Sequence, residues 1–295
     1  MKKLQKNIYY HTTRDGINIG CVIGDTGVVS IDLPSSAEEA LDWRAQITAL
    51  TNKPLRAVVF TSADRASSAA LAALAPHPGP LSIPAIIHEA GFTQLYAALE
   101  ASQPKSPEPL NPVQLREQAV LPEATFSEAT TIVVGAENPL FLDVKRVGGY
   151  SAGSAIVAVR DADIVFAGDL ITSKEPAPLV GCNLDEWIAA LTEMKRSLKT
   201  AMIVPGRGLV ADAETITETL TYLKAARTTV QRLVRSRKTR ADAAGLATEL
   251  LALYPLKTSK SRRSVNVSAI ERRIALGLEY LFDQLSKPAD PPITS

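Results

Sequence analysis

The stretch VVFTSADRASSAALAAL, Val58 to Leu74, decides how this chain is interpreted. Its first residues form an apolar run typical of a strand buried on both faces, and its last residues form an Ala/Leu-rich segment that favours a helix. The loop between them follows the carboxyl end of a strand, where α/β folds usually place ligands and catalytic groups. That loop contains Ser62, Asp64 and Arg65 but no histidine. It is well placed for chemistry, yet it lacks the side chain that acid-base and metal chemistry use most.

Strand-like and helix-like segments alternate on both sides of this stretch. The chain begins with β-rich segments separated by Gly and Asp-Gly turns, and an amphipathic helix follows at 35–51. Four prolines within 102–112 exclude regular structure there and predict a crossing loop. The order of strands, helix and strand then recurs. We therefore expect an α/β protein with a body at 1–212, whose halves, 1–101 and 113–212, form two sheets packed face to face with helices outside.

Residues 213–295 are predicted to form a basic helical extension. Between Lys224 and Arg273 there are 13 Lys and Arg residues against 3 Asp and Glu, whereas the rest of the chain carries 19 basic and 28 acidic residues. The side chains that define this basic surface are Arg232, Arg235, Arg237, Lys238, Arg240, Lys260, Arg262 and Arg263. Such a surface is able to bind an anionic partner, the acidic body of its own chain, or a neighbouring copy.

The composition indicates a globular protein. Its 295 residues, 46% of them hydrophobic, are enough to bury a core, and the formal net charge is +1. No run of about 18 apolar residues is present, and the first residues lack the apolar segment of a signal peptide. We therefore expect no membrane span and a cytoplasmic location. Cys21 and Cys182 are too few for a disulfide framework and are expected to be small buried side chains.

Five short motifs lie in the same order as those of a known fold family. They are VVSIDLP (28–34), VVFTSADRASS (58–68), GGYSAGS (148–154), IVFAGDL (164–170) and IVPGRG (203–208). Through these motifs the chain resembles the metallo-β-lactamase-fold hydrolases from about residue 7 to residue 212. Its helical tail is similar to the extension of the glyoxalase-II-like branch. The resemblance implies an α/β fold, an αββα four-layer sandwich with a C-terminal helical extension.

The same resemblance implies a dinuclear zinc site whose ligand positions are altered in this chain. The residues at those positions are Ser62, Asp64, Ala66, Ser67, Tyr150, Asp169 and Arg207, and only Asp169 is a retained ligand. Zinc needs three or four N, S or O ligands. The chain's histidines, His11, His77 and His88, fall at no ligand position. We therefore expect a degenerate metal site that binds neither zinc nor another cofactor.

The loss of a metal ion would leave a buried carboxylate without a counter-charge. An unpaired buried anion is costly, and a guanidinium is able to neutralise a carboxylate through two parallel hydrogen bonds. Arg207 occupies a former histidine position on the facing edge. We expect Arg207, together with Arg65, to neutralise Asp169 and Asp64 by an internal salt bridge.

Three functions follow from these expectations. The first is a non-catalytic body retained as a binding or structural subunit, whose partner is another protein or a second copy, with no residue assigned a catalytic role. The second is a hydrolase with altered chemistry in the same cleft, although a nucleophilic serine needs a base and no histidine is placed to serve. The third is nucleic-acid binding through the basic tail. Since Tyr254 is the one aromatic residue between the two basic runs, base stacking is not indicated, and a protein partner is favoured.

Overall fold

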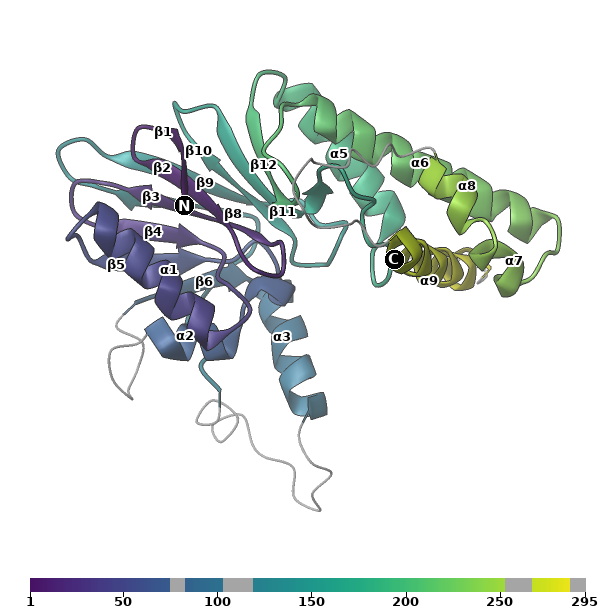
Figure 1. Cartoon of the computed structure of the whole chain (residues 1–295), viewed down its shortest axis with the longest axis horizontal. Helices are drawn as coiled ribbons and strands as arrows, with labels where there is room; N and C mark the ends of the chain where they lie inside the picture. The colour runs from purple at the N-terminus through teal and green to yellow at the C-terminus, as the bar shows by residue number, and fades with distance from the viewer. Residues whose placement is uncertain (75–82, 103–118, 253–266, 287–295) are drawn as a thin grey trace, which may run out of the picture.

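The computed structural model of the chain describes residues 1–74, 83–102, 119–252 and 267–286. It contains two β-sheets that pack face to face, with helices on both outer sides (Figure 1). Figure 1 places α1 and α2 against one sheet, and α5 to α9 on the side of the other. The predicted four-layer order of helices, sheet, sheet and helices is therefore confirmed.

Sheet A has seven strands in the order of the sequence. They are β1 (Lys2–Gln5), β2 (Ile8–Thr12), β3 (Asn18–Ile23), β4 (Val28–Ile31), β5 (Leu55–Val59), β6 (Ala85–His88) and β7 (Ala124–Phe126). The first four pair antiparallel, which fits the tight turns between them, and β4 to β7 pair parallel. The carboxyl ends of β4 and β5 therefore meet at one edge of the sandwich.

Sheet B has five strands in the order β12, β11, β10, β9 and β8. Their bounds are β8 (Ala129–Val134), β9 (Leu140–Arg146), β10 (Ala155–Val159), β11 (Ile164–Thr172) and β12 (Met202–Arg207). The strands from β8 to β11 pair antiparallel, and β12 pairs parallel with β11. The longest of them, β11, is buried along its whole length, as expected for a strand covered on both faces.

The helices follow the amphipathic segments of the sequence. They are α1 (Ala37–Leu50), α2 (Ser68–Leu74), α3 (Glu89–Ser102), α5 (Leu184–Ser197), α6 (Glu214–Arg235), α7 (Arg240–Ala244), α8 (Ala247–Ala252) and α9 (Val267–Leu285), with a 3₁₀ turn, η1 (Ala63–Arg65). The side chain of Ser36 caps α1 by accepting a hydrogen bond from the backbone N–H of Glu39. Acidic residues in the first turns of α1 and α5 complement the helix dipole.

Three apolar layers hold the sandwich together. The central layer lies between the sheets and includes Val59 of sheet A and Phe166 of sheet B. A second layer packs sheet A against α1 and α2 around Trp43, and a third packs sheet B against α5 and α6 around Trp187. Both tryptophans are fully buried. Gly20 allows a close approach between the sheets, since a Cβ at this position would lie 2.2 Å from the ring of Phe166.

The structure differs from the sequence prediction in three places. β7 belongs to the second half of the chain but completes sheet A, because it pairs in parallel with β6. Within the predicted helical extension, the described residues 240–252 form not one continuous helix but the short helices α7 and α8, which are separated by Gly245 and Leu246. The predicted crossing loop, 102–112, contains the end of α3 at Ser102 and otherwise lies outside the described residues.

The helical tail packs directly on the body. Ile216 and Leu223 of α6 share a core with Trp187 of α5. Salt bridges join Arg227 to Asp185 and Arg273 to Glu175, so basic residues of the tail contact acidic residues of the body. The division at residue 212 remains a prediction. Within the described ranges, no helix has the length and apolar character that crossing a bilayer requires.

The contact at Gly20 gives a test of the sheet packing. We expect Gly20→Ala to destabilise the protein by about 1–3 kcal/mol, because the new methyl group would overlap the Phe166 ring. Gly245→Ala is the matched control, since its Cβ would meet no atom closer than 3.5 Å and its φ is −60°. Urea unfolding of both variants measures the difference. Equal stability of the two would mean that the sheets do not approach each other at Gly20.

Candidate functional site

The ends of β5, β11 and β12 bring the candidate site together at one edge of the sandwich. The apolar strand β5 runs into Thr61 and Ser62, and η1 then turns the chain so that Arg65 points inward. Asp169 lies within the buried strand β11, and Gly206 lies next to it on β12. These segments correspond to the motifs VVFTSADRASS (58–68), IVFAGDL (164–170) and IVPGRG (203–208) of the sequence.

A buried ion pair between Arg65 and Asp169 is the centre of the site. Arg65 Nε donates to Asp169 Oδ2 at 2.7 Å, and Arg65 Nη2 donates to Asp169 Oδ1. Nη2 also donates to the carbonyl of Gly206 at 3.3 Å. Arg65 is 3% exposed and Asp169 9% exposed, so the pair is screened from solvent. Burial by itself lowers the pKa of Arg65, but the charge and hydrogen bonds of Asp169 outweigh it and the pKa is raised overall.

The backbone at Gly206 makes room for this pair. A Cβ at position 206 would lie 2.8 Å from Arg65 Nη2, so a side chain there would displace the guanidinium. The remaining nitrogen, Arg65 Nη1, is buried and has no hydrogen-bond partner among the described residues. The guanidinium is therefore held by one carboxylate and one carbonyl on neighbouring strands.

A second buried carboxylate, Asp32, lies at the end of β4. Its two oxygens accept hydrogen bonds from Thr61, one from the backbone N–H at 2.8 Å and one from the hydroxyl at 2.7 Å. Burial raises the pKa of Asp32 to about 6, although the charge of Arg65 and the bonds from Thr61 oppose this shift. Asp32 has φ 58°, a left-handed conformation that Asp and Asn tolerate better than most residues.

Asp64 and Tyr150 form the outer part of the site. The Tyr150 hydroxyl and the Asp64 carboxyl are hydrogen-bonded, and the Tyr150 ring meets the Trp187 ring edge-on at a centroid distance of 5.6 Å. Desolvation and the charge of Asp169 raise the pKa of Asp64. Burial, followed by the charges of Asp169 and Asp64, raises the pKa of Tyr150. Both shifts favour the neutral forms.

Three of the residues at the expected ligand positions have packing or capping contacts. Ala66 is buried. Ser67 accepts a hydrogen bond from the backbone of Ala70 at the start of α2 and donates to the carbonyl of Ser35 at 2.9 Å. Ser62 is also buried, and its hydroxyl lies 3.5 Å from Asp169 Oδ2. Ser62 therefore contacts the carboxylate at the outer limit of a hydrogen bond.

The expected roles of Arg207 and Asp64 in the salt bridge are wrong. Arg207 Nη1 donates to the backbone carbonyl of Asp15 at 2.6 Å, and it is Arg65 that covers both oxygens of Asp169. No salt bridge joins Asp64 to either arginine among the described residues. The physical reason is reach, because η1 directs Arg65 into the space beside Gly206, whereas the end of β12 directs Arg207 towards the turn at Asp15.

The residues of this edge do not fit a zinc ion. In the described part of the chain, no three His, Cys, Asp or Glu side chains are grouped so as to hold a metal. Both oxygens of Asp169, the ligand that the resemblance retains, bind a guanidinium. A cation in that position cannot donate an electron pair to a metal.

The two histidines that the structure describes, His11 and His88, are engaged by groups other than the ion pair. His11 is stacked against Trp43, with centroids 5.9 Å apart. His88 is buried, accepts a hydrogen bond from the Ala90 backbone at Nδ1, and contacts the Ser127 carbonyl at 2.5 Å through Nε2. Nε2 therefore carries the proton, and both nitrogens are engaged. His77 lies outside the described residues. Cys21 and Cys182 are buried and free, as predicted.

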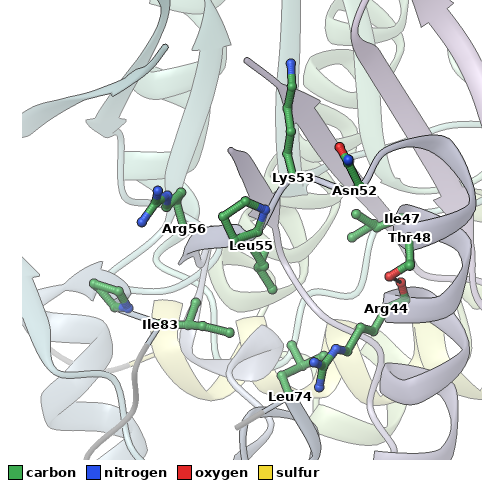
Figure 2. A pocket seen from close by; sticks show the side chains of 11 residues that line it. Arg44, Ile47, Thr48, Asn52, Lys53, Leu55, Arg56, Leu74 and Ile83 are labelled. Carbon is green, nitrogen blue, oxygen red and sulfur yellow. Dashed lines mark hydrogen bonds between the residues drawn. The ribbon is translucent and has the colours of Figure 1, made fainter. Parts of the chain in front are cut away.

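A pocket of about 600 Å³ lies at the opposite edge of sheet A, at the amino ends of β5 and β6 (Figure 2). Its lining includes the cations Arg44, Lys53 and Arg56 beside apolar side chains. Lys53 Nζ donates to the Gly24 carbonyl at 2.7 Å, and Arg56 Nε donates to the Thr26 carbonyl at 3.3 Å. Two of the three cations are thus engaged by the β3–β4 turn.

Sequence reasoning missed two buried polar contacts at the site edge. The Asp32–Thr61 pair was not assigned a role, although the position of Asp32 directly after a buried strand was a usable signal. Asn18, on β3, donates to the carbonyls of Pro205 and Gly208 at 2.9 Å each and so ties sheet A to the end of β12. An asparagine inside a strand gives no sequence signal for such a contact.

Comparison with known proteins supports the fold. Neither a protein-family model nor a curated protein matches the chain. Solved structures do match it. A metallo-beta-lactamase from Pontibacter korlensis has a TM-score of 0.58 at 20% identity, covering 76% of this chain and 97% of that one. DIM-1 metallo-beta-lactamase (TM-score 0.59, 18% identity) and VMB-1 (0.58, 19%) each cover 76% of this chain and 96% of their own. The chain therefore has the metallo-β-lactamase fold.

The raised pKa of Asp32 predicts how stability depends on pH. Burial raises the pKa of Asp32 from its ordinary value of 3.8 to about 6, so the folded state keeps the proton to a higher pH than the unfolded state does, and stability is lost as the pH rises through this range. Two pKa units correspond to about 3 kcal/mol. Asp32→Asn keeps the size and the left-handed tolerance, and we expect it to lack this loss. Unfolding measured between pH 4 and pH 7 tests this, and parallel profiles for the wild type and the variant would contradict it.

Proposed function

We propose that this chain is a non-catalytic protein of the metallo-β-lactamase fold that acts as a binding or structural subunit. In this proposal the Arg65–Asp169 pair takes the structural place that a metal ion has in the fold's hydrolases. The observation that carries the proposal is the guanidinium of Arg65, which covers both oxygens of Asp169 in a buried position.

The electrostatics of the edge support this proposal. Asp169 lies on a strand buried on both faces, where an uncompensated carboxylate would be strongly unfavourable. Arg65 supplies the opposite charge and adds a hydrogen bond to the neighbouring strand through Gly206. The ion pair therefore joins the turn after β5 to both β11 and β12, which are the segments that a metal would join.

The chemistry of the remaining side chains gives little support to an altered hydrolase. Ser62 is the serine nearest to the ion pair, and its hydroxyl is directed at Asp169 over 3.5 Å. Asp169 is already bound by Arg65, which makes it a poor base. The histidines in the described ranges are engaged with Trp43 or with backbone groups elsewhere. A nucleophile without a base is not activated.

Nucleic-acid binding through the tail is a second candidate, favoured by one observation. Arg232, Arg235, Arg237 and Lys238 are all exposed around the end of α6. Arg240, by contrast, is paired with Glu279 and Asp283 of α9. The other predicted basic residues, Lys260, Arg262 and Arg263, lie outside the described residues. Binding to arbitrary duplex DNA that weakens steeply with salt would support this candidate.

Substitution of Arg65 tests the structural role of the pair. We expect Arg65→Met to cost about 3–5 kcal/mol, because it leaves a buried carboxylate unpaired. The double variant Arg65→Met/Asp169→Leu should recover much of this loss, since it removes both charges. Arg207→Met is the matched control and should cost less than about 1 kcal/mol, because the hydrogen bond described for the Arg207 side chain is to the exposed backbone carbonyl of Asp15. Denaturant unfolding of the four proteins decides, and equal effects of Arg65→Met and Arg207→Met would refute the role.

Metal content tests the proposed function itself. Elemental analysis of protein purified without chelators should find zinc, iron and manganese far below one equivalent per chain. The physical reason is that Arg65 occupies the oxygens of the retained aspartate. One or two ions per chain that survive dialysis would contradict the proposal, and hydrolase assays would then come first.

A further inference from the structure

The two sheets have four edges, and three of them are poorly suited to further strand pairing. β1 carries Lys2 and Lys3 and has an irregular register with β2. β7 has three residues. β12 contains a proline and is bridged to Ala211 on its way into the tail. Lysine, proline, irregular register and short length are the features that keep sheet edges from pairing.

The fourth edge, β8, has none of these features. Its sequence, ATTIVV, contains no charge, no proline and no glycine, and five of its six residues are β-branched. Its register with β9 is regular over all six residues. In the described part of the chain no strand pairs with its other side. β8 therefore has the composition of a strand that is paired on both sides, although β9 is its partner on one side and no described strand pairs with the other.

The hydrogen-bond pattern shows which backbone groups face outward. The N–H of Arg146 donates to the carbonyl of Glu128, so these opposed residues form a hydrogen-bonded pair. In an antiparallel ladder such pairs alternate, so Ala129, Thr131 and Val133 direct their N–H and C=O groups away from β9. These three residues are exposed, and Val133 is 54% exposed.

We propose that β8 pairs antiparallel with β8 of a second copy of this chain, about a two-fold axis through Thr131. In this register Ala129 lies opposite Val133 of the second copy, and Thr131 lies opposite its own equivalent. The outward groups of all three residues are then paired, and the two five-stranded sheets become one continuous sheet of ten strands. The pairing is isologous, so the dimer closes and does not extend into a fibre.

The charge pattern favours a second copy as the occupant. A two-fold axis brings every residue near its equivalent, so a charged strand would repel itself, and β8 has no charge. The Asp143 carboxylate beside it is neutralised by Arg160 and accepts a hydrogen bond from Thr131. The described helices on the side of sheet B share a core with β10, β11 and β12, and that core includes no residue of β8 or β9.

A single strand pair makes a small interface. Interfaces at the low end of the size range are weak and transient, so dimerisation should require high protein concentration. Because backbone bonds and uncharged side chains form the contact, salt should have little effect on it. Association through the basic tail would instead weaken as salt rises, which separates the two routes.

This inference rests on the proposed function in that it names the partner of the binding or structural subunit. The two fail separately, because metal analysis tests the loss of the metal site and the experiments on β8 test the dimer. A protein that binds metal and forms the β8 dimer would contradict the proposed function and leave the dimer standing. A metal-free protein that does not form the dimer would do the reverse.

Cross-linking at the two-fold axis tests the register. We expect Thr131→Cys to form a disulfide-linked dimer on mild oxidation, because the two thiols would face each other across the axis. Val133→Cys is the matched control, since its two thiols would be separated by four residues, roughly 13 Å along the strands. The natural cysteines are buried and give a low background. At least a five-fold excess of dimer from Thr131→Cys is expected, and equal yields from the two variants would overturn the proposal.

Mass in solution provides the second measurement. In sedimentation experiments on the wild type, the mass should rise from that of one chain to that of two as the protein concentration is raised to about 1 mM. The rise should persist in about 1 M salt. Thr131→Lys should remain at one chain, because it places two like charges at the axis. Thr221→Lys, an exposed site on α6, is the control and should behave as the wild type. A wild type of one chain throughout, or a dimer unaffected by Thr131→Lys, would overturn the proposal.

Discussion

The buried ion pair between Arg65 and Asp169 is the interaction on which this edge of the molecule depends. Arg65 belongs to the turn that leaves sheet A, and Asp169 belongs to β11 of sheet B, the strand beside the edge strand β12. A neighbouring contact reinforces the connection, because the backbone of Ala155 on β10 donates to the carbonyl of Thr61. Apolar contacts are non-directional, and these directional bonds add to the packing in fixing the relative position of the two sheets.

The fold could be predicted from the sequence because its evidence is local. Apolar runs, turn residues and the Ser36 cap specify strands and helices without reference to the rest of the chain, and the motif order places them in one architecture. The partner of Asp169 could not be predicted in the same way. Arg65 and Arg207 both have the reach to bind a carboxylate, and the choice between them depends on backbone directions and on the space beside Gly206, which arise only in three dimensions. The same holds for β7, whose sheet is decided by pairing with β6.

The positions at which the resemblance implies metal ligands are occupied by residues with contacts of their own. Ser67 caps α2, Ala66 fills buried space, and Tyr150 packs against Trp187 while bonding to Asp64. Each position is therefore integrated with its surroundings. The packing, capping and charge-balancing contacts of these residues contribute to the stability of the scaffold, which is a property of the fold and separate from any function.

Asn18 has a consequence for how the chain reaches its native state. Its side chain bonds to the carbonyls of Pro205 and Gly208, positions 187 and 190 residues further along the chain. During synthesis the first β-strands therefore emerge from the ribosome long before their partners exist, and they remain incompletely bonded until residue 208 has been translated. Contacts of such long sequence separation slow folding and prolong the exposure of unpaired strands. The nascent N-terminal half therefore carries a polar side chain whose bonding partners do not yet exist.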